Sequence, residues 1–400
     1  MAEVWRAVHV SQGIPVAVKV LTADKARSAR FQQLIHNEAR AMAGLHHPGI
    51  ALVYDVGRTD EGSPWIAMEM ATGGSLEDLV DIEVPWHDLK PLLLALLDAL
   101  AHAHARGVLH RDLKPANVLM CSEGDLRPGI KLSDFGLAMP LNTSEGSTRI
   151  SGTPAFMAPE QVRGAWRDFG PWTDLYAFGC LAWQLCCGFT PFRGERIEDW
   201  LRAHLEDEPG DLAPRSAVPA GLEAWLRRLL EKSPARRYRA AADVAWGLLQ
   251  LGDAVHTGPS PWPLSGRSHL SLNLTVIGML EAVRAEGSTA ETVPLPRPEC
   301  APLVRDWRRE EDEPSLRMQG AGLGLFALRS VPMVGRAAER DQVWACLFRA
   351  VQGAEAQAVI VRGPAGVGKT RLCDWVCQRA AEMGAVNVLR VTHSPVSGPE

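Results

Sequence analysis

The first part of the chain alternates between short apolar runs and polar stretches. Residues 16–20 (VAVKV) form an apolar run with one lysine, preceded by glycine and proline, which predicts a buried strand. Residues 23–45 are polar and rich in helix-favouring residues. Residues 51–56 and 64–70 are two further strand-like runs, separated by the turn-rich segment RTDEGS. The pattern predicts a small unit of strands with a helix.

From residue 92 onward the apolar positions recur at helical spacing. A largely buried helix is expected to end at Gly107, because glycine suits the end of a helix. Three more helices are predicted at residues 173–187, 222–230 and 240–251. A larger helical unit therefore follows the small one.

The periodicity is lost between residues 253 and 332. This stretch contains proline-rich (PSPWPLSG, VPLPRPECAP), charged (RDWRREEDEP) and glycine-rich (GAGLGL) segments, which predict a connector between domains. Order returns with a helix expected over residues 337–352, a strand over 358–361, a glycine-rich turn and another helix. We therefore expect three parts: a domain over residues 1–252, a linker over 253–332 and the first part of a second domain over 333–400.

Composition and charge exclude several classes of function. The chain has 47 acidic and 42 basic residues and no long run of Lys or Arg, so nucleic acid is not expected as a partner. Its longest apolar run, residues 92–97, is far shorter than the roughly 20 residues that cross a bilayer. The first residues (MAEVWRAVHV) lack the pattern of a secretory signal. We expect a cytoplasmic protein without a membrane span, whose eight cysteines are free thiols.

The most specific motif is HRDLKPAN at residues 110–117. It is followed by DFG at residues 134–136 and by APE at residues 158–160, in the chain order of the protein kinase signature. Phosphoryl transfer requires a positioned γ-phosphoryl group, a metal that neutralises its charge and an oriented hydroxyl nucleophile. These motifs offer a candidate residue for each task.

On these motifs, residues 1 to about 251 resemble the eukaryotic-like (Hanks-type) bacterial serine/threonine protein kinases. The resemblance implies an α+β two-lobed protein kinase fold that uses ATP and Mg²⁺ and transfers the γ-phosphoryl group to Ser or Thr of protein substrates. The substrates would include the protein itself, through self-association that allows autophosphorylation in trans. Serine/threonine specificity is indicated by Lys114 and by the GTP segment at residues 152–154.

The resemblance also implies a role for each residue of the site. Asp112 would orient the substrate hydroxyl and accept its proton, Lys114 would stabilise the transferring phosphate, and Thr153 would brace both. Asn117 and Asp134 would bind magnesium, and Lys19, paired with Glu38, would contact the α- and β-phosphates. The adenine pocket would consist of Val4, Ala17, the gatekeeper Met68, the hinge from Glu69 to Ala71, and Leu119.

Three further expectations come from the same resemblance. Glu160 and Arg237 would form a buried ion pair, and Asp174 would accept a hydrogen bond beneath the catalytic loop. Arg111, directly before Asp112, suggests control by phosphorylation between DFG and APE, because a phosphate there can pair with arginine. Thr148 and Ser151 are the preferred sites, and the alternative is a merely hydrophilic loop.

The first residues depart from the kinase pattern. When Val4 is aligned with the last position of the GxGxxGxV loop, Ala2 occupies the third glycine position, so the first two glycines and the strand before them are absent. Either the start that is printed lies downstream of the true one, or this kinase has lost its phosphate lid. For this chain we expect weakened ATP binding and a small lobe that lacks its first strand.

A second nucleotide motif, GPAGVGKT, occupies residues 363–370 and fits the P-loop pattern. In such a loop the backbone amides cradle phosphates, the lysine neutralises them and the Thr binds magnesium. The residues concerned are Gly363, Gly366, Gly368, Lys369 and Thr370. Together with VGRAAER at residues 334–340, the motif resembles AAA+ or STAND-type ATPases and predicts a partial α/β P-loop domain with a second ATP site. No Walker B acidic strand is visible in the thirty residues after the motif.

Two functions are compatible with these motifs. The first is a protein serine/threonine kinase coupled to a nucleotide-binding regulatory domain in signal transduction. The alternative is an inactive kinase-like scaffold in which the P-loop domain carries the signal. ATPase activity as the main function is disfavoured by the missing Walker B strand.

Overall fold

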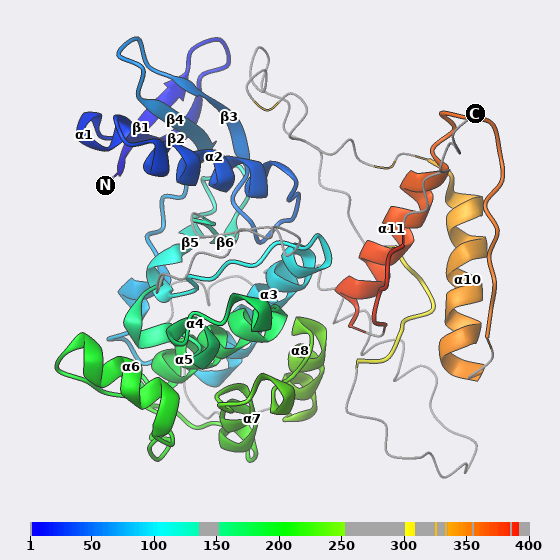
Figure 1. Ribbon diagram of the computed structural model, residues 1–400. Coiled ribbons are helices and arrows are strands. Elements are labelled where there is room, and N and C mark those ends of the chain that lie inside the picture. Colours follow the sequence, from blue (N-terminus) through cyan, green and yellow to red (C-terminus); the bar gives the residue numbers. More distant parts are fainter. Residues whose placement is uncertain are drawn as a thin grey trace, which may run out of the picture.

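The computed structural model describes residues 2–135, 152–252, 301–308, 325, 333, 335–353, 356–384 and 386–391. Within these residues a small lobe of strands lies next to a larger helical lobe, and two further helices lie along the side of the large lobe (Figure 1). None of the described helices is long and apolar enough to cross a membrane. The activation-loop candidates Thr148 and Ser151, and most of the expected linker, lie outside the described residues.

A four-stranded antiparallel sheet with the order β1-β2-β4-β3 forms the small lobe. Its strands are β1 (Ala2–His9), β2 (Ile14–Leu21), β3 (Val53–Arg58) and β4 (Pro64–Glu69). The last three were expected, whereas β1 was not, because its apolar residues Val4, Trp5 and Val8 are exposed and follow no buried pattern.

The single helix expected over residues 23–45 is divided into α1 (Ala23–Ala26) and α2 (Ala29–Ala43). The division falls at Ser28, whose extended backbone precedes the first turn of α2. Serine favours such positions because its side chain competes with helical hydrogen bonding. Helix α2 buries Ile35, Ala39 and Met42 at helical spacing, and Glu38 lies on the same buried stripe.

The large lobe consists mainly of helices, and two short strands face the small lobe. Helix α3 begins at Trp86, before Pro91, because Trp86 and Leu89 are buried and extend its packed face. The elements of this lobe are α3 (Trp86–Ala105), β5 (Val118–Cys121), β6 (Gly129–Leu132), α4 (Pro159–Val162), α5 (Pro171–Cys187), α6 (Ile197–Glu206), α7 (Leu222–Leu229) and α8 (Ala241–Gln250). Short 3-10 turns occur at Leu76–Leu79, Pro115–Asn117, Pro154–Phe156, Trp166–Asp168 and Pro234–Arg236.

Helices α10 (Ala337–Gly353) and α11 (Lys369–Glu382) follow the large lobe in the chain, and α11 lies against α3. The strand expected at residues 358–361 is not formed: no described segment pairs with it, and Val359 and Ile360 are exposed. A strand requires a hydrogen-bonded neighbour, which local sequence alone does not supply.

A buried ion pair joins α4 to the end of the large lobe. Arg237 donates to both carboxylate oxygens of Glu160, at 2.8 and 3.0 Å, and its side chain is fully buried. Thr173 donates to the same carboxylate at 2.8 Å. The buried pair expected from the sequence is thus confirmed, and removal of one partner would leave the other charge buried without compensation.

We therefore expect Arg237→Ala to lower the free energy of unfolding by about 3–5 kcal/mol. The neighbouring Arg236→Ala is the matched control, since Arg236 is exposed and lies 3.9 Å from Glu231. This change should cost less than about 0.5 kcal/mol. Urea unfolding of both variants tests the difference. Equal decreases in the free energy of unfolding would show that the buried pair contributes no more to stability than the exposed one.

Candidate active site

Lys19 of β2 lies between two carboxylates at the junction of the lobes. Its ammonium group donates to Glu38 of α2 at 2.8 Å and to Asp134 at 2.5 Å. Asp134 comes from the DFG motif, which follows β6 in the large lobe. One side chain thus connects the small-lobe sheet, its helix and the large lobe.

Burial and charge act in opposite directions on this group. Burial raises the pKa of Glu38 to about 7, although Lys19 opposes the shift. Burial alone would lower the pKa of Lys19, but the two carboxylates reverse this effect and raise it. Lys19 is therefore held as a cation, which is the state that a phosphate contact requires.

The catalytic-loop side chains converge on Asp112. Thr153 donates to Oδ1 of Asp112 through both its backbone N–H and its hydroxyl, each at 2.9 Å. Lys114 Nζ donates to the Thr153 hydroxyl at 3.0 Å and lies 3.3 Å from Asp112 Oδ2. Asn117 donates to the Asp112 carbonyl at 2.8 Å. The structure thus brings together four residues that the sequence placed up to 41 positions apart.

Asp174, at the start of α5, supports this loop from below. Its carboxylate accepts hydrogen bonds from the backbone N–H groups of His110 and Arg111, both at 2.8 Å, which confirms the contact expected from the sequence. Burial would raise the pKa of Asp174, but His104 and these backbone donors hold it below its usual value. Arg111 and Asp134 both have left-handed backbones, with φ of 66° and 59°. Such backbones are strained in non-glycine residues and cluster at functional sites.

The residues expected around the adenine base lie on strands β1, β2, β4 and β5 and directly after β4. Ala17 of β2 and Met68 of β4 are buried and are paired side by side on adjacent strands. Leu119 of β5 is half-buried. Val4 of β1 is exposed, and Ala71 is half-buried after the hinge. These residues supply apolar walls of the kind that hold an aromatic base.

A further residue at the hinge was not predicted from the sequence. Arg127 forms a buried two-pronged ion pair with Glu69, with its Nε donating to one carboxylate oxygen at 2.9 Å and its Nη2 to the other. Glu69 also accepts from the backbone N–H of Leu52. Arg127 lies in the polar segment SEGDLRP, which resembles an exposed loop and contains no signal of a buried arginine.

The donor set suits a magnesium ion. Asp134 offers a carboxylate whose side chain is 42% exposed, and the Asn117 amide nitrogen is used by Asp112, so its oxygen is the atom that can serve as a ligand. Magnesium is commonly held by one or two protein oxygens together with nucleotide phosphates and water.

The P-loop motif forms a tight turn directly before α11. Gly366 and Gly368 have left-handed backbones, with φ of 79° and 85°, which glycine adopts without strain. Lys369 is the first residue of α11, and its ammonium donates to the carbonyls of Gly363 and Pro364 at 2.9 and 2.7 Å. Thr370 follows in the first turn. The loop amides and the helix N-terminus thus lie together, an arrangement that favours anions.

The fold and the catalytic loop define a two-lobed protein kinase. The protein kinase domain model matches residues 1–245, and the chain belongs to this family. It carries a bacterial serine/threonine kinase domain, since its relatives include a probable serine/threonine-protein kinase of Corynebacterium efficiens (33% identity; 61% of this chain, 38% of the relative) and the serine/threonine-protein kinase PknB of Mycobacterium tuberculosis (31%; 76% and 48%). The chain therefore spans less than half the length of either relative.

We expect Thr153→Val to lower the kcat of phosphorylation by about 10- to 100-fold, because a hydrogen bond to a charged group contributes about 1.5–3 kcal/mol. The substitution removes the hydroxyl between Lys114 and Asp112 and preserves the size of the side chain. Thr153→Ser retains the hydroxyl and is the matched control. Steady-state kinetics should show little change in the KM for ATP, and equal activity of the Val and Ser variants would contradict a role for this hydroxyl.

Proposed function

We propose that this chain is an ATP-dependent protein kinase that transfers the γ-phosphoryl group to Ser or Thr of protein substrates, itself included. The observation that carries this proposal is the position of Lys19, which bonds both Glu38 and Asp134. A lysine held in this way can receive the nucleotide phosphates only when the two lobes and α2 are all in place. The kinase family supports the same conclusion.

Each side chain has a defined task in the proposed reaction. Asp112 accepts the proton of the substrate hydroxyl, and Thr153 orients its carboxylate by two hydrogen bonds. Lys114 stabilises the charge of the transferring phosphoryl group, and Lys19 holds the α- and β-phosphates. Magnesium, held by Asp134 and Asn117, neutralises the phosphate oxygens when it is bound.

Autophosphorylation tests this function directly. The chain incubated with γ-labelled ATP and magnesium should become labelled on Ser or Thr, and Asp112→Asn should lose at least about 100-fold of the rate, because general-base catalysis contributes about 10²–10⁴-fold. Thr190→Ser serves as the control, because the Thr190 hydroxyl donates to the carbonyl of Phe192 within the large lobe and the serine retains a hydroxyl. Absence of label in both the chain and a version extended at its N-terminus would favour the scaffold alternative.

We further propose that residues 333–400 begin a P-loop ATPase-like regulatory domain, so that the protein binds ATP at two sites. Three features support this proposal: the left-handed glycines Gly366 and Gly368, the start of α11 at Lys369, and the packing of α10 against α11. In this proposal Gly363 and the other loop amides bind the phosphates, and Thr370 binds magnesium. The protein acts in cytoplasmic signal transduction, without a nucleic acid or membrane partner.

A change at the P-loop should remove one of two nucleotide sites. We expect Lys369→Ala to reduce the number of ATP molecules bound per chain from two to one in isothermal titration calorimetry, since Lys369 supplies the cation that neutralises the phosphates. Arg349→Ala, which removes an exposed cation from α10, should leave both sites intact. A stoichiometry that Lys369→Ala leaves unchanged would disprove the second site.

A further inference from the structure

Helix α11 and the residue after it pack closely on the kinase large lobe. Ala380 and Met383 are buried, and the C-terminal end of α11 meets the C-terminal end of α3. Figure 1 shows this end of α11 next to the large lobe. Gly384 has φ of 68°, and a Cβ at this position would lie 3.0 Å from Ala242 of α8. Glycine adopts this backbone angle without strain, and a larger residue would crowd Ala242. The contact with the kinase domain is therefore specific in shape.

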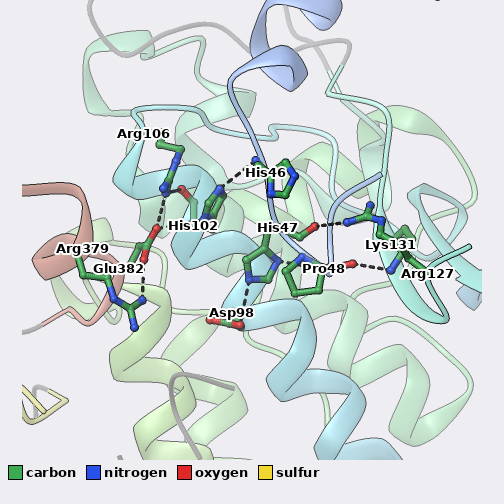
Figure 2. A network of polar contacts seen from close by, with 11 residues as sticks. His46, His47, Pro48, Asp98, His102, Arg106, Arg127, Lys131, Arg379 and Glu382 are labelled. Carbon is green, nitrogen blue, oxygen red and sulfur yellow. Dashed lines mark hydrogen bonds and ion pairs between the residues drawn. The ribbon is translucent and has the colours of Figure 1, made fainter. Parts of the chain in front are cut away.

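A buried carboxylate lies at the centre of this contact. Glu382 is 6% exposed and accepts hydrogen bonds from Arg106, directly after α3, and, at 2.8 Å, from Arg379 of its own helix (Figure 2). Its Oε1 also lies 3.1 Å from Nδ1 of His102. A buried carboxylate is strongly unfavourable unless it is paired. Part of the charge of Glu382 is thus compensated by the kinase domain, through Arg106. An exposed glutamate would be compensated by water and would need no such partner.

His102 lies between Glu382 and the loop that carries His46. Its Nε2 accepts the backbone N–H of His46 at 3.3 Å, so the proton of the neutral ring lies on Nδ1, the nitrogen that is 3.1 Å from Glu382. Burial lowers the pKa of His102 well below its usual value, which keeps the ring neutral. Arg106, which bonds Glu382, also donates to the carbonyl of His102 at 3.0 Å. Glu382 thus contacts His102 both directly and through Arg106, and the same His102 ring accepts from the backbone of His46.

His46 belongs to the loop between α2 and β3, and this loop is tied to the active site from two sides. Helix α2, which ends at Ala43, carries Glu38, the partner of Lys19. The carbonyl of His47 accepts from Arg127, which also holds Glu69 at the hinge. The network in Figure 2 thus connects Glu382 with the loop that positions both α2 and the hinge.

The opposite end of α11 begins at the P-loop. The helix runs from Lys369 to Glu382, so one rigid element of about 20 Å joins the phosphate-binding turn to the buried carboxylate. A ligand at its N-terminus that shifts the helix must also shift Glu382 relative to Arg106 and His102.

We propose that α11 couples nucleotide binding at residues 363–370 to the kinase active site through the contact between Glu382 and His102. The inference rests on the proposed nucleotide site and specifies how that site regulates the kinase. Coupling between two sites typically changes an affinity or a population by about 5- to 150-fold. Nucleotide binding at the P-loop thus changes the position of the loop that contains His46. This loop in turn positions Glu38 and the hinge.

A double-mutant cycle tests the coupling. Kinase activity toward a generic basic protein is measured at saturating ATP for the chain, Lys369→Ala, Glu382→Gln and the double variant. We expect Lys369→Ala to change kcat/KM by at least about fivefold alone, and by less than about twofold in the Glu382→Gln background. His102→Phe, which leaves the pairs of Glu382 with both arginines in place, should abolish the effect in the same way.

Asp374→Asn is the matched control, because it removes a carboxylate of the same helix that is paired with Arg390 and exposed. It should preserve the full effect of Lys369→Ala. Hydrogen exchange provides a second readout: the amide of His46 should exchange differently in the chain and in Lys369→Ala at saturating ATP, and equally in the two when Glu382 is Gln.

The possible failures can be distinguished. Equal effects of Lys369→Ala with Glu or Gln at position 382, in an active kinase that binds two nucleotides, would overturn the coupling alone. If Lys369→Ala has no effect on the activity of this kinase with either Glu or Gln at position 382, the coupling is overturned as well. An ATP stoichiometry that Lys369→Ala does not lower would overturn the proposed P-loop site, and the inference with it.

Discussion

The position of Lys19 between Glu38 and Asp134 is the constraint on which the active site depends. The three residues come from β2, from α2 and from the segment after β6, so their contact requires the small-lobe sheet, its helix and the large lobe to be placed correctly at once. A buried ammonium group is costly unless it is paired, and here two carboxylates compensate it. The same cost makes the arrangement specific, because any displacement of α2 leaves a charge buried without its partner.

Buried charge recurs wherever distant segments of this chain meet. Glu69 and Arg127 join the hinge to the loop before β6, Glu160 and Arg237 join α4 to the end of the large lobe, and Glu382 joins α11 to α3. Apolar packing would hold such segments together with more freedom of register. Ion pairs with fixed hydrogen-bond geometry define which groups must face each other, although they add little net stability.

Elements that depend on the local sequence were predicted well, and elements that depend on distant parts of the chain were predicted poorly. Helices α3, α5, α7 and α8 and strands β2 to β4 follow from periodicity, and HRDLKPAN is specific enough to identify Asp112 and Asn117 without a structure. Strand β1, strands β5 and β6, and helix α6 were missed, because their stability depends on neighbours that lie elsewhere in the chain. The strand at residues 358–361 was predicted from its apolar run, yet no described segment pairs with it.

Arg127 and Glu382 show most clearly why some buried charged residues escape sequence reasoning. Both are charged residues in polar surroundings, and such residues are exposed in most proteins. What makes each of them significant is a partner 58 or 276 positions away, Glu69 or Arg106. The catalytic-loop and P-loop motifs are runs of adjacent residues, so they are visible in the sequence. Pairs of residues that lie far apart in the chain leave no such run, and only the folded chain shows them.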